Sequence, residues 1–276
     1  MLIYYINAFL KGVLEGITEF LPISSTGHLI LVRDWLPLTP DTNIEHVKTL
    51  DDIFDVIIQL PAILAVMLLY RARLWESVKT IPTNAKSKAF WIGLVVAVMP
   101  VVILGPLVHK KLEANFMAMV PVAIALILGG IILILIERGG DNGKYTTAED
   151  TPILTAFFIG VFQCFSMFPG TSRSASTIVG GRLMHLTRNA AAEYSFFLAI
   201  PTMFGAFAYK MFKSWKLIQA EHVPVLLIGS ITSFVVSWIV VNWLIGYVRK
   251  HSLAAFGYYR IALGLIVLAY YYATHK

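Results

Sequence analysis

Long apolar runs alternate with short polar segments along the whole chain. Six uninterrupted runs have about the 17 to 25 residues that a helix needs to cross a bilayer. They cover residues 54–70, 89–109, 117–136, 194–212, 223–248 and 253–273. The pattern therefore predicts six transmembrane helices.

Two further apolar regions, residues 4–36 and 153–184, are interrupted in the middle by Pro, Gly, Ser and Thr. Irregular backbone at membrane depth is tolerated only where it is buried in protein or lines a wet cavity. We interpret each region as a re-entrant helix-loop-helix that enters the membrane and returns to the same side. The alternative for each is a spanning helix that is kinked at its proline.

The second interrupted region resembles the first in layout. "PISSTG" begins at Pro22 and "PGTSRS" at Pro169, and a span containing a proline follows each motif. Aligning the two prolines pairs Ser24 with Thr171, Ser25 with Ser172 and Thr26 with Arg173. Three predicted crossings separate the motifs, so the second motif enters from the opposite face. Repeats of this kind are typical of folds whose broken helices meet near the bilayer midplane.

The predicted fold is an all-α polytopic membrane protein with one membrane domain, residues 1–276. It consists of two inverted-topology repeats, residues 1–140 and 141–276. Each repeat holds a re-entrant motif, at residues 15–28 and 169–181, and three transmembrane helices.

Composition agrees with a membrane protein, because 58% of the residues are hydrophobic and only 14% are charged. The N-terminus lacks the basic region and cleavage site of a signal peptide. Cys164 is the only cysteine, so no intramolecular disulfide is expected. The net charge of +6 comes mainly from short loops and indicates contact with membrane lipids, with no nucleic-acid partner.

Loop charge predicts the orientation. Residues 71–88 hold five basic residues and one acid, which places this loop in the cytoplasm by the positive-inside rule. The opposing loops contain Lys110, Lys111, Lys213 and Lys216, so the bias is modest. The first motif would then enter from the outer side.

The first motif, "EGITEFLPISSTGH", concentrates ionisable groups. Glu15 and Glu19 are four residues apart and share a helix face. Two carboxylates so close repel each other unless they share a proton or bind a cation, which for oxygen ligands is magnesium or calcium. A surface pair on an amphipathic helix is the alternative.

Ser24, Ser25, Thr26 and Gly27 form a loop whose hydroxyl and N–H groups are suited to phosphate oxygens. His28 lies three residues after Ser25, so the two are candidates for a nucleophile and its acid or base. Ser and Thr hydroxyls that bond their own backbone are the alternative.

The second motif supplies a fixed cation, Arg173, between Ser172 and Ser174. Its planar guanidinium suits bidentate binding of phosphate, and the helix that starts near Ser174 to Thr177 adds backbone donors. An arginine that only reaches toward the interface is the alternative. Weaker candidates are Asp55, Glu193 and Arg260.

"EGITEFLPISSTGH" and "PGTSRSAST" closely resemble the two signature segments of the bacterial undecaprenyl-diphosphatase family, also called undecaprenyl pyrophosphate phosphatases or bacitracin-resistance proteins. The resemblance covers essentially the whole chain. It implies hydrolysis of undecaprenyl diphosphate to undecaprenyl phosphate and inorganic phosphate, which recycles the lipid carrier for cell-wall synthesis and confers bacitracin resistance. It also implies a divalent cation, magnesium or calcium, and a bacterial plasma (inner) membrane location with the active site open to the outer side.

The resemblance places the family's functional residues on Glu15, Glu19, Ser25, Thr26 and His28 in the first motif and on Ser172, Arg173, Ser174 and Thr177 in the second. Together with the chemistry of the residues, we predict that Ser25, His28, Glu19 and Arg173 are catalytic and that Glu15 and Glu19 bind the metal. The predicted diphosphate-binding residues are Ser24, Thr26, Gly27, Ser172, Arg173, Ser174 and Thr177.

Two other classes of function share features with this sequence. Acid-phosphatase-like lipid phosphatases require a histidine where this chain has Val179, which argues against that class. A lipid-phosphate flippase stays open, because inverted repeats are common in transporters. Whether Ser25 or water attacks, and whether the chain forms a homo-oligomer, also stay open.

Overall fold

The computed structural model describes residues 1–41, 43–116 and 118–274. Within these residues the chain is helical and contains no strand longer than a single bridge. The helices are α1 (Leu2–Thr18), α2 (Ser25–Val32), α3 (Ile44–Leu69), α4 (Arg71–Lys79), α5 (Ala85–Phe116), α6 (Met119–Glu137), α7 (Ile153–Gln163), α8 (Arg173–Leu183), α9 (Arg188–Ser214), α10 (Val223–Val248) and α11 (Ala254–Thr274), with short 3₁₀ turns between some of them.

Six helices of the described residues are long and apolar enough to cross a membrane, which confirms the six predicted spans. They lie in α3, α5, α6, α9, α10 and α11. Met117, at the start of the third predicted span, lies outside the described residues, as do residues 275–276 at the end of the predicted domain. The all-α polytopic fold is therefore confirmed.

Both interrupted regions break where the sequence predicts. α1 and α2 are separated by residues 19–24, and α7 and α8 by residues 164–172. α2, α7 and α8 have 8, 11 and 11 residues, and at 1.5 Å per residue none of them crosses about 30 Å of hydrocarbon. Each region is thus a helix-loop-helix.

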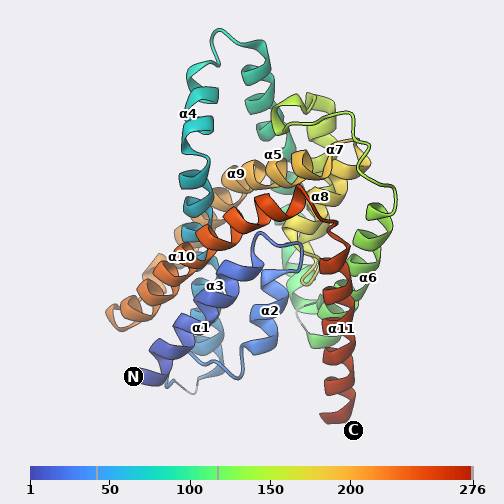
Figure 1. The fold of residues 1–276 in the computed structure, drawn as a ribbon. Coiled ribbons are helices and arrows are strands. Elements are labelled where there is room, and N and C mark those ends of the chain that lie inside the picture. The colour runs from blue at the N-terminus through green and yellow to red at the C-terminus, as the bar shows by residue number, and fades with distance from the viewer. Residues whose placement is uncertain (42, 117, 275–276) are drawn as a thin grey trace.

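The helices form an elongated bundle (Figure 1). Both termini lie at one end, and the turn between α4 and α5 projects at the other. α6 and α11 run side by side along one edge, while α1 lies against α10 and α5 against α7.

The packing of the two halves is reciprocal. α1 lies along α10, and α7 lies along α5. A glycine permits each close approach: a β-carbon at Gly12 would lie 2.6 Å from the Gly229 carbonyl oxygen, and one at Gly160 would lie 2.2 Å from the Ala97 carbonyl oxygen. Any larger residue at either position would separate the paired helices.

A shared apolar core joins the halves. Phe20, next to the first loop, packs edge-on against Phe196 of α9, with ring centroids 5.7 Å apart. Phe197 packs in the same way against Tyr70 and Phe90. These contacts hold the first loop, the junction of α3 with α4, α5 and α9 together.

Candidate active site

The loop between α1 and α2 and the loop between α7 and α8 end in the same kind of cap. Ser24 and Ser172 have φ of 74° and 75°, a left-handed conformation that is unusual outside glycine. The Ser24 hydroxyl accepts a hydrogen bond from the Gly27 N–H at 3.2 Å, and the Ser172 hydroxyl accepts one from Ala175 N–H at 3.2 Å. Each serine is thus the N-cap of the outgoing helix.

The shared cap aligns the two loops with an offset one residue different from that of the proline alignment. Aligning the prolines paired Ser24 with Thr171, whereas the caps pair Ser24 with Ser172. The same offset pairs Gly12 with Gly160. The prolines do not align because they lie within the loops. The serines cap the outgoing helices, and the glycines permit close helix contacts, so these residues occupy equivalent positions. Ser25 then corresponds to Arg173.

Both loops line one cavity of about 600 Å³. Six of the predicted site residues border it: Glu19, Ser24, Ser25, Thr26, Ser172 and Arg173. The fold therefore brings together the two motifs, which lie far apart in the sequence.

Glu19 bonds both Ser25, the candidate nucleophile, and the guanidinium of Arg173. Ser25 Oγ donates to Glu19 Oε2 at 2.5 Å, and Arg173 Nη2 donates to Glu19 Oε1 at 2.9 Å. The Glu19 side chain is only 7% exposed. Hydrogen bonds to an ionised partner are short and strong, so these two bonds orient both Ser25 and Arg173. The sequence predicted Glu19 as a partner of Glu15 and did not predict its bond to Ser25.

Arg173 is further oriented by α9. Its Nη1 donates to the Ser195 carbonyl oxygen at 3.1 Å, and its guanidinium carbon lies 5.7 Å from the centre of the Phe20 ring. Met203 Sδ contacts Nη2 at 3.3 Å. No motif marks Ser195 or Met203, and only the packing of α9 against α8 reveals them.

His28 is not bonded to Ser25. Its Nδ1 lies 2.7 Å from the Ser24 carbonyl oxygen, and its Nε2 lies 2.7 Å from the Tyr259 hydroxyl. A carbonyl oxygen only accepts, so Nδ1 is the donor, and Nε2 of a neutral imidazole then accepts from Tyr259. The structure assigns the Ser25 hydroxyl to Glu19, and the predicted catalytic role of His28 stays a prediction.

Glu15 is fully buried, and neither carboxylate oxygen has a hydrogen-bond partner among the described residues. A buried charge without a partner is costly, so the group must bind a proton or a cation. Magnesium commonly binds one or two carboxylates together with substrate phosphate, which fits Glu15. Glu19 fits less simply, because its oxygens already accept from Ser25 and Arg173. The described residues contain no cluster of three candidate metal ligands.

Three predicted phosphate-binding residues support the loops and do not line the cavity. Ser174 Oγ donates to the Leu21 carbonyl oxygen at 2.8 Å and so joins the second loop to the first. Thr177 Oγ1 lies 2.7 Å from Ser195 Oγ. Gly27 lies so close to its cap that a β-carbon there would be 3.1 Å from Ser24 Oγ. Their contact with a diphosphate stays a prediction.

The weaker candidates have different surroundings. Asp55 accepts from Arg33 at 3.3 Å, and Glu193 accepts from Arg73 at 2.8 Å, so both belong to ion pairs. Arg260 is fully buried between the two loops.

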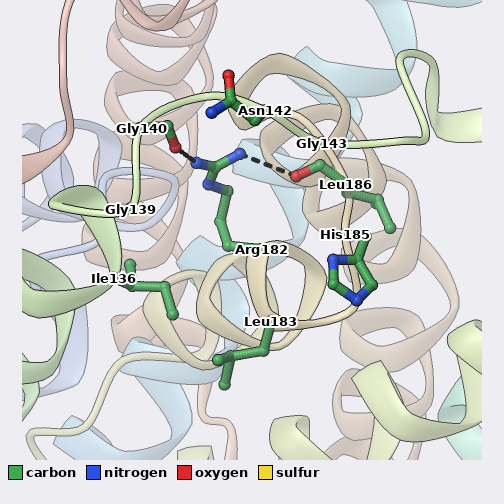
Figure 2. Close-up of a pocket in the computed structure, with 9 residues that line it drawn as sticks. All are labelled: Ile136, Gly139, Gly140, Asn142, Gly143, Arg182, Leu183, His185 and Leu186. Carbon is green, nitrogen blue, oxygen red and sulfur yellow. Dashed lines mark hydrogen bonds between the residues drawn. The ribbon is translucent and has the colours of Figure 1, made fainter.

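A second pocket, of about 370 Å³, lies at the C-terminal ends of α6 and α8 (Figure 2). Its cation, Arg182, donates to the carbonyl oxygens of Gly140 and Leu186 and pairs with Asp141 at 2.6 Å. None of the predicted site residues lines this pocket. Its charge is already satisfied, so the cavity between the loops is the candidate active site.

One protein family and several known proteins resemble this chain over almost its whole length. The sequence profile of a family described as "Bacitracin resistance protein BacA" matches residues 8–266. Undecaprenyl-diphosphatase 1 of Paraburkholderia xenovorans is 42% identical over 95% of this chain and 93% of its own length. Undecaprenyl-diphosphatase 2 of Shewanella oneidensis is 43% identical, covering 97% of this chain and 98% of its own. An undecaprenyl-diphosphatase of Cereibacter sphaeroides is 41% identical over 95% of both chains.

Proposed function

The chain belongs to the bacitracin resistance protein BacA family, and we infer that it is an undecaprenyl-diphosphatase of the membrane. It hydrolyses undecaprenyl diphosphate to undecaprenyl phosphate and inorganic phosphate. The reaction recycles the lipid carrier for cell-wall synthesis and confers resistance to bacitracin. The assignment of this activity to the site rests on the cavity that both polar loops line.

The lining of the cavity suits an amphiphilic substrate. Its polar part includes Ser25, Arg173 and the two helix N-termini, whose N–H groups favour anions. Helices α5 and α9 supply an apolar part: Val98, Val101, Val102, Pro106 and Ala206. We propose that the diphosphate binds at the loops while the isoprenyl chain leaves along the apolar wall.

Ser25 is the proposed nucleophile. Its oxygen attacks the terminal phosphorus, the bond from that phosphorus to the bridging oxygen breaks, and undecaprenyl phosphate leaves with the bond's electron pair. Glu19 receives the hydroxyl proton directly, because it already accepts that hydrogen bond at 2.5 Å. Arg173 and the helix N-termini stabilise the charge on the transferred phosphoryl group.

Water then attacks the phosphorus of the phosphoserine, and both of its protons leave with the inorganic phosphate as H2PO4⁻. Glu19 returns its proton to Ser25 Oγ as the bond from that oxygen to phosphorus breaks. Direct attack by water, with Glu19 as base, is the alternative that the same geometry permits. His28 orients the first loop in either case, since it bonds both Ser24 and Tyr259.

Phosphate release by purified protein in detergent tests the function. Release of one phosphate per undecaprenyl diphosphate consumed is expected. No release, combined with movement of undecaprenyl phosphate across vesicle membranes, would instead support the lipid flippase.

We propose that a divalent cation, magnesium or calcium, binds at Glu15 with Glu19 and the substrate's phosphate oxygens. The cation would neutralise charge on the diphosphate. Glu15→Gln is expected to lower kcat/KM and to raise the magnesium concentration needed for half-maximal activity, because a charged oxygen ligand is lost. Titration of magnesium after chelation measures both effects. Gln163 is the counterpart of Glu15 in the second repeat by the corrected alignment, and Gln163→Ala is the control.

Full turnover in excess chelator would remove the cation from this proposal. An unchanged magnesium dependence in Glu15→Gln would leave Glu15 as a buried protonated acid.

We also propose that residues 1–140 and 141–276 are inverted repeats. The reciprocal packing supports this: a β-carbon at Gly130 would lie 2.6 Å from the Gly257 carbonyl oxygen, and one at Gly257 would lie 2.8 Å from the Gly130 carbonyl oxygen. The chemistry is nevertheless divided unequally. Glu15 and Glu19 correspond to Gln163 and Met167, so one repeat supplies the acids and the other supplies Arg173.

The active site is proposed to open to the outer face of the bacterial inner membrane. The cavity touches α5 only from Val98 onward, in the half of the helix distant from the basic segment 71–88. The start of α5 is bound to the α6–α7 loop by the ion pair of Lys86 with Asp150 at 2.6 Å. If the basic segment is cytoplasmic, the cavity faces outward.

Labelling of a single cysteine tests this orientation. Ala72 on α4 is exposed and small, so Ala72→Cys in a Cys164→Ser background is expected to resist a membrane-impermeant thiol reagent in intact cells and to react after the membrane is opened. Labelling from outside intact cells would reverse the assignment.

A further inference from the structure

Among the described residues, Arg260 has the largest side chain that is fully buried. It projects from α11 toward α6, where a β-carbon at Gly129 would lie 2.1 Å from Arg260 Nη2. Glycine at this position therefore makes room for the guanidinium. The pairing of a glycine with a buried arginine points to a dedicated place for the cation.

The guanidinium bonds the backbone of both re-entrant loops. Nη1 donates to the carbonyl oxygen of Pro22 at 3.1 Å, and Nη2 donates to that of Gly170 at 3.1 Å. Two further bonds reach α6, from Nη2 to Ala125 at 3.2 Å and from Nε to Leu126 at 3.3 Å. One planar group thus joins the first loop, the second loop and α6.

The preceding residue strengthens this link. Tyr259 bonds His28, which in turn bonds the Ser24 carbonyl oxygen. Two consecutive residues of α11 therefore fix the first loop on both sides of its serine cap, although α11 contributes no residue to the cavity lining.

No carboxylate pairs with Arg260 in the described part of the chain, in contrast to Arg73, Arg173, Arg182 and Arg188. A buried charge balanced only by carbonyl dipoles is costly. Gly170, one of its bonded residues, lines the cavity. An anionic diphosphate at the loop tips would supply the missing negative charge at short range, where the low dielectric makes the attraction strong.

We propose that Arg260 is a positioning residue of the phosphatase. It holds the Ser25 loop and the Arg173 loop at one separation, and it adds a buried positive charge that favours the bound diphosphate. This inference rests on the proposed function but assigns a role to a residue outside both signature motifs and outside the cavity wall.

The test compares Arg260→Lys and Arg260→Gln with the parent by kcat on undecaprenyl diphosphate and by the inhibition constant of inorganic pyrophosphate. Arg260→Lys keeps the charge but cannot bond both loops and α6 in the same plane. It is expected to bind pyrophosphate within about threefold of the parent and to lose about 10² in kcat, the effect of a small misplacement of reacting groups. Arg260→Gln also loses the charge, so pyrophosphate should bind about tenfold more weakly as well.

Arg188→Gln is the matched control, because Arg188 is a largely buried arginine that pairs with Glu137 away from the cavity. It should lower thermal stability while leaving the pyrophosphate inhibition constant unchanged. Gel filtration and melting in detergent show whether each variant is folded.

Folded Arg260→Gln with parental kcat and parental pyrophosphate binding would overturn the inference. If Arg260→Gln does not fold, Arg260→Lys decides: full kcat overturns the positioning role, and a lowered kcat with retained pyrophosphate binding supports it. A parent protein that releases no phosphate would instead refute the proposed function.

Discussion

Ser25→Ala lowers kcat for phosphate release by about 10² or more, the range usual for a lost nucleophilic or acid–base group. Ser25 lines the cavity and donates to the Glu19 carboxylate at 2.5 Å, which both orients the hydroxyl and provides a proton acceptor. The measurement is kcat at saturating undecaprenyl diphosphate. Ser166→Ala is the control, since Ser166 lines the same cavity without belonging to the proposed chemistry.

Variants of Glu19 and His28 show which of these two residues accepts the proton of the Ser25 hydroxyl. If Glu19 accepts the proton, Glu19→Gln loses a similar factor, and the double variant with Ser25→Ala is little worse than either alone, because groups that act as a unit are not additive. His28→Ala is expected to lose about 10² if histidine is the acceptor. A Ser25→Ala variant with near-parental kcat would eliminate the phosphoserine and leave direct attack by water.

Arg173→Lys lowers kcat/KM by about 10²-fold, the loss expected when one transition-state donor is removed. The guanidinium bonds Glu19 with one terminal nitrogen and Ser195 with the other, and it stacks near Phe20. A lysine ammonium is a point charge that cannot make these bonds at once or present a planar pair of donors to phosphate. The variant thus loses the orientation of Glu19 together with part of the phosphate site.

The matched control for Arg173 is Arg182→Lys on the same helix, α8. Arg182 also donates through both terminal nitrogens, but to the loop around Gly140 in the second pocket. Its kcat/KM should stay near that of the parent. An Arg173→Lys variant with parental kcat/KM would show that a positive charge alone suffices at this position.

Much of the fold was predictable because membrane segments obey strict rules. A backbone in hydrocarbon must satisfy its own hydrogen bonds, so an apolar run of sufficient length is a helix. The six spans followed from this alone. The breaks near Ser24 and Ser172 were predictable for the same reason, since Pro, Gly and hydroxyl residues at membrane depth indicate irregular backbone. The offset that aligns the two loops was not predictable, because the loops place their prolines differently relative to the caps.

The sequence by itself determined which residue types meet: two long polar motifs with acids and hydroxyls in one and an arginine in the other. That prediction held for the cavity formed by Glu19, Ser25 and Arg173. Only the tertiary structure decided the pairing within it. Helical spacing relates Glu19 to Glu15 and Ser25 to His28, since these are neighbours along the chain. The bonds of Glu19 to Ser25 and Arg173 depend on how the loop folds back and how α8 meets it. The roles of Ser195, Tyr259 and Arg260 likewise depend on contacts between distant helices, which no local pattern encodes.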